Sequence, residues 1–298
     1  MQKPATAVRL IGALLLAGTA AAQSQPGGVQ RALYNTTKQK LLEGKQVFSF
    51  TQSKFDIKGY CEAAKHYDFA WFEMQHSTLE FRDVEAMIAT CPYAGATPMV
   101  RLPDAQEWHI QHATDIGALG IVVPTVDDVD RAREAAKWAY YPPKGRRSSG
   151  QNQATRIWGI NGINYRQTIN DNMMVVVMIE TPTGAANAFD IASVPGIDVV
   201  IIGNNDLSSF SGYSQDDPRY QAMVTKIHDD TIRAGKIFGQ ANAKYAKGHP
   251  LSSTAFFFQN GPSKDGWVPP SAAGGGRNPN APPEGETEGL GHSQTQKR

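Results

Sequence analysis

The feature that most constrains the fold of this chain is a regular alternation of short apolar runs with helix-like segments. Eight runs rich in β-branched and aromatic residues span residues 46–51, 68–73, 96–101, 120–124, 173–180, 198–203, 237–241 and 254–259. Helical patterns lie between several of them, at residues 78–90, 105–116, 126–139 and 218–234. Near-continuous apolar strands separated by helices are typical of a parallel sheet that is covered on both faces.

Eight strands of this kind indicate the α/β class, and we expect a (β/α)8 TIM barrel over residues 31–268. A doubly wound open sheet is the alternative. No G-x-G-x-x-G follows the first run, so a dinucleotide-binding fingerprint is absent from that position. Residues 140–172 interrupt the alternation and are rich in Gly, Arg and Asn, so we expect an extended functional loop with a short helix there.

The two ends of the chain differ from its middle. Lys3 and Arg9 precede a mostly apolar run at residues 10–22, and this pattern predicts a signal peptide over residues 1–22. We therefore expect an exported protein, periplasmic or secreted; a buried N-terminal helix is the alternative. The run is too short to span a bilayer by itself, so no membrane association is expected after cleavage. Residues 269–298 are rich in Pro and Gly and predict a disordered tail.

Charge and cysteine content narrow the function classes. The 29 Lys and Arg residues are balanced by 28 Asp and Glu, without the positive surplus that a nucleic-acid-binding protein needs. The two cysteines, Cys61 and Cys91, are too few for a disulfide scaffold or a Cys-rich zinc site. In an exported protein they form one disulfide or remain two buried thiols, and the sequence leaves both possibilities open.

Polar residues stand at the ends of four apolar runs: His76, Arg101, Glu180 and Asp206. In a TIM barrel, catalytic side chains come from the carboxyl ends of different strands. Glu180 and Asp206 are separated by about one βα repeat, so we expect their carboxylates to meet across neighbouring strands. Two convergent carboxylates suit a hard ion such as Mg²⁺ or Mn²⁺.

Each of these residues also has an ordinary structural explanation. Glu180 could pair with Arg101, and Asp206 could cap a helix that begins at Leu207. A single histidine such as His76 is more often structural than catalytic. The presence of all four residues at strand ends favours a joint site.

These residues lie within a sequence that resembles the HpcH/HpaI aldolase family, the metal-dependent class II pyruvate aldolases related to the citrate lyase β subunit. The resemblance covers about residues 45–240. It is carried by seven segments in order, at residues 73–76, 100–103, 115–124, 141–146, 179–181, 194–198 and 203–208. Residues 256–262 lie outside these segments, and we interpret them as the eighth strand and its loop.

The resemblance implies a role for each matching residue. Glu180 and Asp206 would hold a divalent cation, Mg²⁺, Mn²⁺ or Co²⁺, that binds a 2-oxo acid. Backbone N–H groups near Asn205 and Asp206 would receive the carboxylate of that acid. Arg101 would stabilise the enolate oxygen as negative charge develops.

The resemblance also implies a proton-transfer pair. His76 would be the general base that removes the proton from the distal hydroxyl group of the substrate. Asp115 matches the position that raises the basicity of this histidine, and in related barrels a neighbouring subunit can provide that help. We therefore expect a homo-oligomer.

Several positions depart from the family pattern, namely Gln75, Met178, Asn204 and the Arg147-Ser148 pair that follows Arg146. The expected function is thus an aldehyde-lyase that cleaves a 4-hydroxy-2-oxo acid to pyruvate or a related 2-oxo acid and an aldehyde, with an altered substrate. The alternative is an exported, catalytically degenerate barrel that binds an oxo acid or a sugar acid. A CoA-ester lyase ranks last, because the chain is short for a CoA-binding lid.

Overall fold

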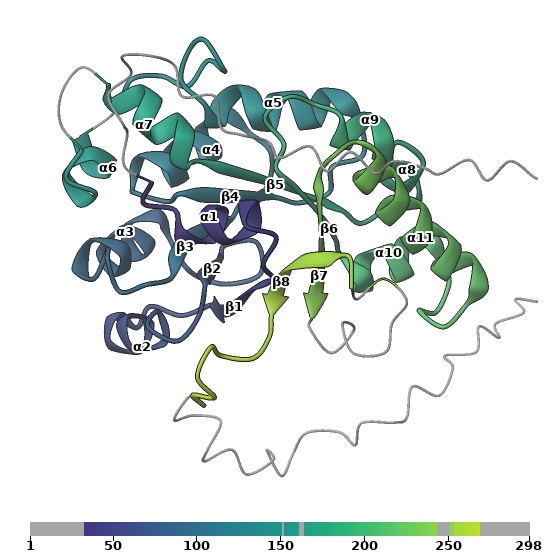
Figure 1. Cartoon of the computed structure of the whole chain (residues 1–298). Coiled ribbons are helices and arrows are strands. Elements are labelled where there is room, and N and C mark those ends of the chain that lie inside the picture. The colour runs from purple at the N-terminus through teal and green to yellow at the C-terminus, as the bar shows by residue number, and fades with distance from the viewer. Residues whose placement is uncertain (1–32, 151, 161–163, 243–250, 252, 269–298) are drawn as a thin grey trace, which may run out of the picture. The chain divides into compact units, whose positions relative to one another are not determined.

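A closed barrel of eight parallel strands forms the centre of the protein (Figure 1). The computed structural model describes residues 33–150, 152–160, 164–242, 251 and 253–268. The strands are β1 (Val47–Gln52), β2 (Phe69–Glu73), β3 (Thr97–Arg101), β4 (Gly120–Val123), β5 (Met174–Ile179), β6 (Val199–Ile202), β7 (Ile237–Asn242) and β8 (Ala255–Asn260). Each strand pairs with the next, and β8 closes the sheet against β1. The predicted (β/α)8 barrel is confirmed, and the open-sheet alternative is wrong.

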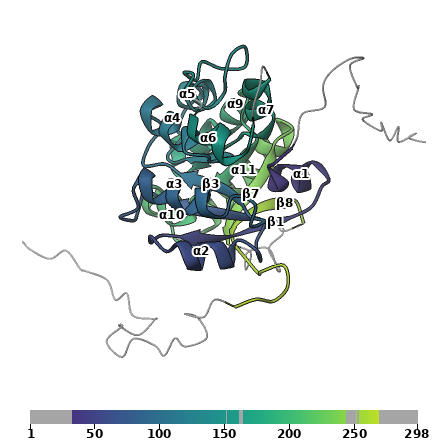
Figure 2. The same cartoon turned by 90° about the vertical axis from the view of Figure 1, so that its left-hand side faces the viewer.

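Helices surround the strands on the outside of the barrel (Figure 2). They are α1 (Thr36–Leu42), α2 (Ile57–Ala63), α3 (Phe81–Thr90), α4 (Glu107–Asp115), α5 (Val129–Ala139), α6 (Asn152–Ile157), α7 (Tyr165–Asn172), α8 (Pro182–Ala186), α9 (Ala188–Ala192), α10 (Asn204–Ser211) and α11 (Pro218–Arg233). The four predicted helices form as α3, α4, α5 and α11. The predicted loop at residues 140–172 differs from expectation, because its described residues carry the two helices α6 and α7 rather than one.

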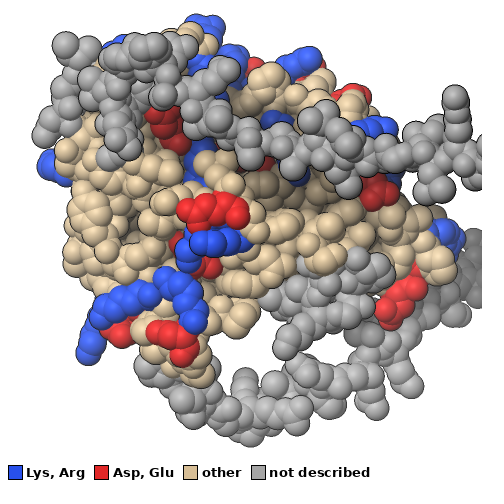
Figure 3. Space-filling view, viewed as in Figure 1, with Lys and Arg blue, Asp and Glu red and all other residues tan. Residues whose placement is uncertain are grey.

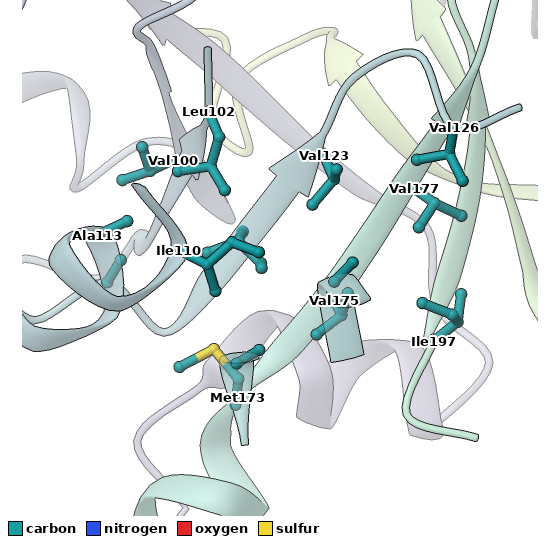
Figure 4. Packing of buried hydrophobic residues seen from close by; sticks show 14 of the residues in the cluster. Val100, Leu102, Ile110, Ala113, Val123, Val126, Met173, Val175, Val177 and Ile197 are labelled. Carbon is teal, nitrogen blue, oxygen red and sulfur yellow. The ribbon is translucent and has the colours of Figure 1, made fainter. Parts of the chain in front are cut away.

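Two apolar cores hold the barrel together. The first fills its interior with inward-facing side chains such as Trp71, Met99 and Phe257. The second lies between strands and helices, where Ile110 and Ala113 of α4 face β4 and β5, including Val123 and Val175 (Figure 4). Because the strands are buried on both faces, they read as continuous apolar runs in the sequence.

Helix α1 covers the amino ends of the strands. The Thr37 hydroxyl donates a hydrogen bond to the carbonyl of Asp68 (2.7 Å), immediately before β2. The buried side chain of Asn35 caps α1 and donates to the carbonyl of Leu119 (3.0 Å), immediately before β4. These bonds satisfy backbone groups that would otherwise be buried without a partner. The opposite mouth of the barrel is therefore the one that can carry a functional site.

A disulfide joins α2 to the end of α3. Cys61 and Cys91 are bonded, with their Cα atoms 5.8 Å apart. Of the two possibilities that the sequence left open, the structure has the bridge rather than two free thiols.

Charged side chains of both signs lie next to one another on the face drawn in Figure 3. Within the described residues, none of the helices is both long and apolar enough to cross a membrane. The predicted signal peptide at residues 1–22 and the predicted tail at residues 269–298 lie outside the described residues.

Candidate active site at the carboxyl ends of the strands

A pocket lies where the inward-facing residues reach the carboxyl ends of the strands. Alternate residues of a strand face the same side, so the inward row of β5 continues from Val176 through Met178 to Glu180. Arg101 is the last residue of β3. The pocket measures about 330 Å³ and is lined by Arg101, Met178, Glu180, Gly203, Asn204, Asn205, Asp206, Ala241, Gln259 and Asn260.

Glu180 is the most deeply buried acidic residue of this pocket, with 1% of its surface exposed. Its Oε1 accepts a hydrogen bond from the backbone N–H of Thr125 (2.8 Å), a residue held at a φ of 49°. Such a left-handed conformation is rare for a β-branched residue. Here it turns the N–H toward the carboxylate.

Burial, followed by the hydrogen-bonded side chain of Asp206, raises the pKa of Glu180 to about 7, although the Thr125 N–H and Arg101 oppose the shift. The two carboxyl groups therefore interact directly, as the spacing of Glu180 and Asp206 predicts. Two carboxyl groups in hydrogen-bond contact cannot both ionise freely in a buried site.

Asp206 reaches the pocket from a helix rather than from a strand end. Strand β6 ends at Ile202 and α10 begins at Asn204, with Gly203 as its N-cap. The interpretation that Asp206 caps a helix beginning at Leu207 is therefore wrong, because the helix begins three residues earlier and Asp206 lies in its first turn.

Gly203 lies directly against the carboxylate of Glu180. A Cβ atom at this position would lie 2.6 Å from Oε2 of Glu180, which is far closer than atoms tolerate. A glycine is therefore required between β6 and α10 for backbone to pack against the Glu180 carboxylate.

The Arg101 guanidinium lies between two buried carboxylates. Its Nη1 is 3.2 Å from Oε2 of Glu73, and its Nη2 is 3.8 Å from Oε2 of Glu180. The structure therefore contains both the Glu180–Arg101 ion pair and the contact between the Glu180 and Asp206 carboxyl groups. Nη2 also donates to the sulfur of Met178 (3.6 Å), and the buried Nε has no partner among the described residues.

Glu73 is a buried site residue that the sequence analysis did not single out. Its Oε2 accepts from Trp71 and Arg101, at 3.0 Å and 3.2 Å. Its Oε1 accepts from the backbone N–H groups of Gln75 and His76, at 3.0 Å and 3.2 Å. The signal that could have found it is the one that found Glu180, namely an acidic residue at the end of an apolar strand.

His76 and Asp115 do not meet within one chain. His76 follows β2 at the mouth of the barrel, but its side chain is exposed and does not line the pocket. Asp115 ends α4, shortly before β4 begins at Gly120, so it lies toward the opposite end of the barrel. Its Oδ1 instead accepts from Nη2 of Arg147 at 2.5 Å.

The first turn of α10 presents amide groups to the pocket. The side-chain oxygen of Asn204 accepts from Tyr220 (2.9 Å), while its buried Nδ2 has no partner among the described residues. Asn205 is exposed, and its side-chain oxygen accepts from Gln215 (3.2 Å). Backbone N–H groups in the first turn of a helix lack partners within the helix, so this end of α10 suits an anion.

The donor set fits a hard divalent cation. The described part of the chain contains no cluster of three or more His, Cys, Asp or Glu residues that could hold a metal. The protein would therefore supply the two carboxylates of Glu180 and Asp206, and water or substrate oxygens would complete the shell. Burial and the neighbouring Asp206 raise the pKa of Glu180 although Arg101 opposes the shift, so its negative charge is disfavoured while no further cation lies beside the pair.

Comparison with known proteins decides the family. The model of the HpcH/HpaI aldolase/citrate lyase family matches residues 60–246. The chain belongs to this family. The resemblance carried by the seven sequence segments is therefore confirmed.

Two curated relatives of this HpcH/HpaI family member are aldolases. The 2-dehydro-3,6-dideoxy-6-sulfogluconate aldolase of Pseudomonas putida is 32% identical over 195 residues, which cover 65% of this chain and 74% of the relative. The 2-keto-3-deoxy-L-rhamnonate aldolase of Shigella sonnei (strain Ss046) is 32% identical over 212 residues, covering 70% and 78%. The protein is accordingly a lyase.

Solved structures agree with this assignment. An HpcH/HpaI aldolase from Desulfitobacterium hafniense DCB-2 superposes with a TM-score of 0.66 at 26% identity, covering 75% of this chain and 90% of that one. The citrate lyase β subunit from M. tuberculosis, complexed with oxaloacetate and magnesium, superposes with a TM-score of 0.52 at 12% identity, covering 74% and 93%. The latter likeness shows the fold alone.

Proposed function

We propose that this lyase is a divalent-metal-dependent aldolase that cleaves a 4-hydroxy-2-oxo acid to pyruvate, or a related 2-oxo acid, and an aldehyde. The observation that carries the proposal is the pair formed by buried Glu180 and half-buried Asp206, beside Arg101 in one pocket. Mg²⁺ or Mn²⁺ is the expected ion, and Co²⁺ is a further candidate. The chemistry that such an ion supplies when bound is polarisation of a keto oxygen.

Arg101 is the residue that we assign to charge stabilisation. Cleavage of the C3–C4 bond leaves an electron pair that must move toward the keto oxygen as an enolate. The guanidinium is held by Glu73 and Glu180, so it is positioned before the substrate arrives. Preorganised charge of this kind is the largest catalytic term in many enzymes.

The carboxylate of the oxo acid is assigned to the amino end of α10. The backbone N–H groups of Asn205 and Asp206 lie in the first turn, where the helix provides no acceptor for them. The unpartnered Nδ2 of Asn204 adds a further donor beside them.

We assign the general-base role to His76, which would accept the proton of the C4 hydroxyl group. The backbone N–H of His76 donates a hydrogen bond to Glu73, and Arg101 donates to the same carboxylate. Glu73 therefore connects the backbone at His76 to the pocket. Asp115 of the same chain lies toward the other end of the barrel. Its proposed assistance therefore requires a neighbouring copy, and we propose a homo-oligomer on that basis.

An assay for released pyruvate tests the function. Pyruvate formed from a panel of 4-hydroxy-2-oxo acids with Mn²⁺ is coupled to lactate dehydrogenase. Glu180→Gln and His76→Ala should each lower kcat/KM by about 100-fold or more, because each removes a group that acts on the reacting atoms. The matched control Gln111→Glu changes a partly exposed residue of α4 outside the pocket and should retain full turnover. Unchanged turnover in the first two variants would refute these roles.

We also propose that the protein is exported, with cleavage after Ala22. The basic and apolar pattern of residues 1–22 and the Cys61–Cys91 disulfide support this location. Intact-mass measurement of the protein from the cell envelope should give a chain that begins at Gln23, whereas an uncleaved chain in the cytoplasm would contradict export.

A further inference from the structure

The pocket extends beyond the proposed metal and carboxylate groups to strands β7 and β8. These strands lie side by side (Figure 1), and they contribute Ala241, Gln259 and Asn260 to the lining. Gln259 continues the inward row that contains Phe257, as Glu180 continues that of Met178. None of these three residues belongs to a segment that carried the family resemblance.

Asn260 is held in place as a rigid amide. Its side-chain oxygen accepts from the hydroxyl of Thr51 (3.0 Å) in β1. Its Nδ2 donates to the carbonyl of Ala241 (3.4 Å) in β7. An amide can make about four hydrogen bonds, so Asn260 keeps one donor and one acceptor for a ligand.

The side-chain amide of Gln259 has fewer hydrogen-bond partners among the described residues than that of Asn260. The backbone carbonyl of Gln259 accepts from the hydroxyl of Ser49, whereas no described residue is hydrogen-bonded to its side chain. The amide therefore retains both donors and its acceptor at the wall of the pocket. We call Gln259 and Asn260 together the amide wall of the pocket. Their uncharged side chains offer both hydrogen-bond donors and hydrogen-bond acceptors to a ligand.

Once a divalent ion and an oxo-acid carboxylate are bound, the charges of the described lining residues balance without a second anionic group. Among the described lining residues, Arg101 carries the only positive charge, and it contacts two carboxylates. With a divalent ion present and an oxo-acid carboxylate bound, an additional sulfonate, carboxylate or phosphate would find no cation among the described residues that line the amide wall. Burying an unpaired charge is costly, whereas hydroxyl groups match amides well.

We propose that Gln259 and Asn260 bind the aldehyde half of the substrate and select an uncharged, hydroxylated chain. This inference rests on the proposed aldolase function and names the class of its second product, a neutral hydroxyaldehyde. The two residues determine specificity and take no part in proton transfer.

Aldol addition of pyruvate to two aldehydes with the same carbon skeleton tests the inference. With Mn²⁺ and the full chain, kcat/KM for glyceraldehyde should exceed that for glyceraldehyde 3-phosphate at least tenfold. Gln259→Lys adds a cation to the wall and should shift this ratio at least tenfold toward the phosphorylated aldehyde, mainly through KM. Gln259→Leu, which removes the amide at similar size, should raise KM for glyceraldehyde about tenfold.

The control is Ser53→Lys, which adds the same charge just beyond β1 at an exposed residue that does not line the pocket. It should leave the ratio unchanged. A preference for the phosphorylated aldehyde in the unsubstituted protein would overturn the inference. So would equal shifts in Gln259→Lys and Ser53→Lys, because the effect would then be a long-range one. If Gln259→Lys does not fold, the KM of Gln259→Leu decides, and an unchanged KM overturns the inference.

A separate measurement distinguishes failure of the inference from failure of the proposed function. Exchange of the pyruvate C3 protons with deuterated water, followed by NMR without any aldehyde, requires enolate formation alone. If the pyruvate protons exchange but the aldol assay shows no preference between the two aldehydes, the specificity inference is wrong and the aldolase proposal stands. Absence of exchange and of turnover would remove both.

Discussion

Two carboxylates flank one guanidinium at the mouth of this barrel, and a third carboxylate contacts one of the two, within the part of the chain that the structure describes. Glu73 and Glu180 flank Arg101, and Asp206 interacts with Glu180. Buried charges of one sign are tolerated only when a partner compensates them. The residue-scale arrangement therefore holds an excess of negative charge that a divalent ion would neutralise.

Stability of the metal-free protein should depend on pH through Glu180. Its pKa is raised from 4.5 to about 7, so the folded state binds one more proton than the unfolded state between these values. The stability from this proton is present below pH 4.5 and is lost as the pH rises through about 7. The loss is at most about 3 kcal/mol. Thermal unfolding of chelator-treated protein should thus show a Tm that falls over this range.

The variant Glu180→Gln is the matched control for this effect, because it keeps the shape of the side chain and cannot ionise. Its Tm should fall less than that of the unsubstituted protein between pH 4.5 and 7. Identical pH profiles for the two proteins would show that Glu180 does not hold the extra proton.

The sequence predicts a site residue where a polar side chain stands at the end of an apolar strand. Arg101 and Glu180 follow this rule, and the structure places both in the pocket. Asp206 also lies there, but the sequence did not show that α10 begins at Asn204. Glu73 follows the same rule as Glu180, but His76 lies three residues later and is the more usual type of catalytic residue, so the pattern favours His76 over Glu73.

At the scale of elements, the eight strands were predictable because both of their faces are buried, which makes each a continuous apolar run. Each predicted strand overlaps the observed one, for example residues 46–51 and Val47–Gln52. The helices α6 and α7 were not separately predictable. They lie in the polar segment of residues 140–172, where the pattern of an amphipathic helix is weak.

The disulfide between α2 and α3 should contribute measurably to stability. Cys61 and Cys91 are 30 residues apart, and closing a loop of that length stabilises by about 3–4 kcal/mol in the chain-entropy account. The double variant Cys61→Ser/Cys91→Ser should therefore unfold at a lower urea concentration. Reductant should produce the same loss in the unsubstituted protein and no change in the double variant. An equal unfolding midpoint for all samples would contradict a stabilising bridge.

At the scale of the whole molecule, the two ends of the barrel differ: the amino end is covered by a helix, and the carboxyl end carries the pocket. Helix α1 covers the amino ends through hydrogen bonds from residues such as Asn35 and Thr37, and the sequence pattern gave no sign of this closure. The carboxyl ends carry the pocket. His76 and Asp115 belong to opposite ends, so one chain does not contain the proton-transfer pair that the family resemblance implies.

Binding of Mn²⁺ to the protein purified without a metal-affinity tag is the most direct test of the central claim, that Glu180 and Asp206 together hold a divalent ion. Isothermal titration at pH 8 should give one site per chain, weakened at least 100-fold in Glu180→Gln and in Asp206→Asn. Glu73→Gln removes a neighbouring buried carboxylate outside the metal pair and should keep the site. Equal Mn²⁺ affinity in the unsubstituted protein, Glu180→Gln and Asp206→Asn would contradict the claim.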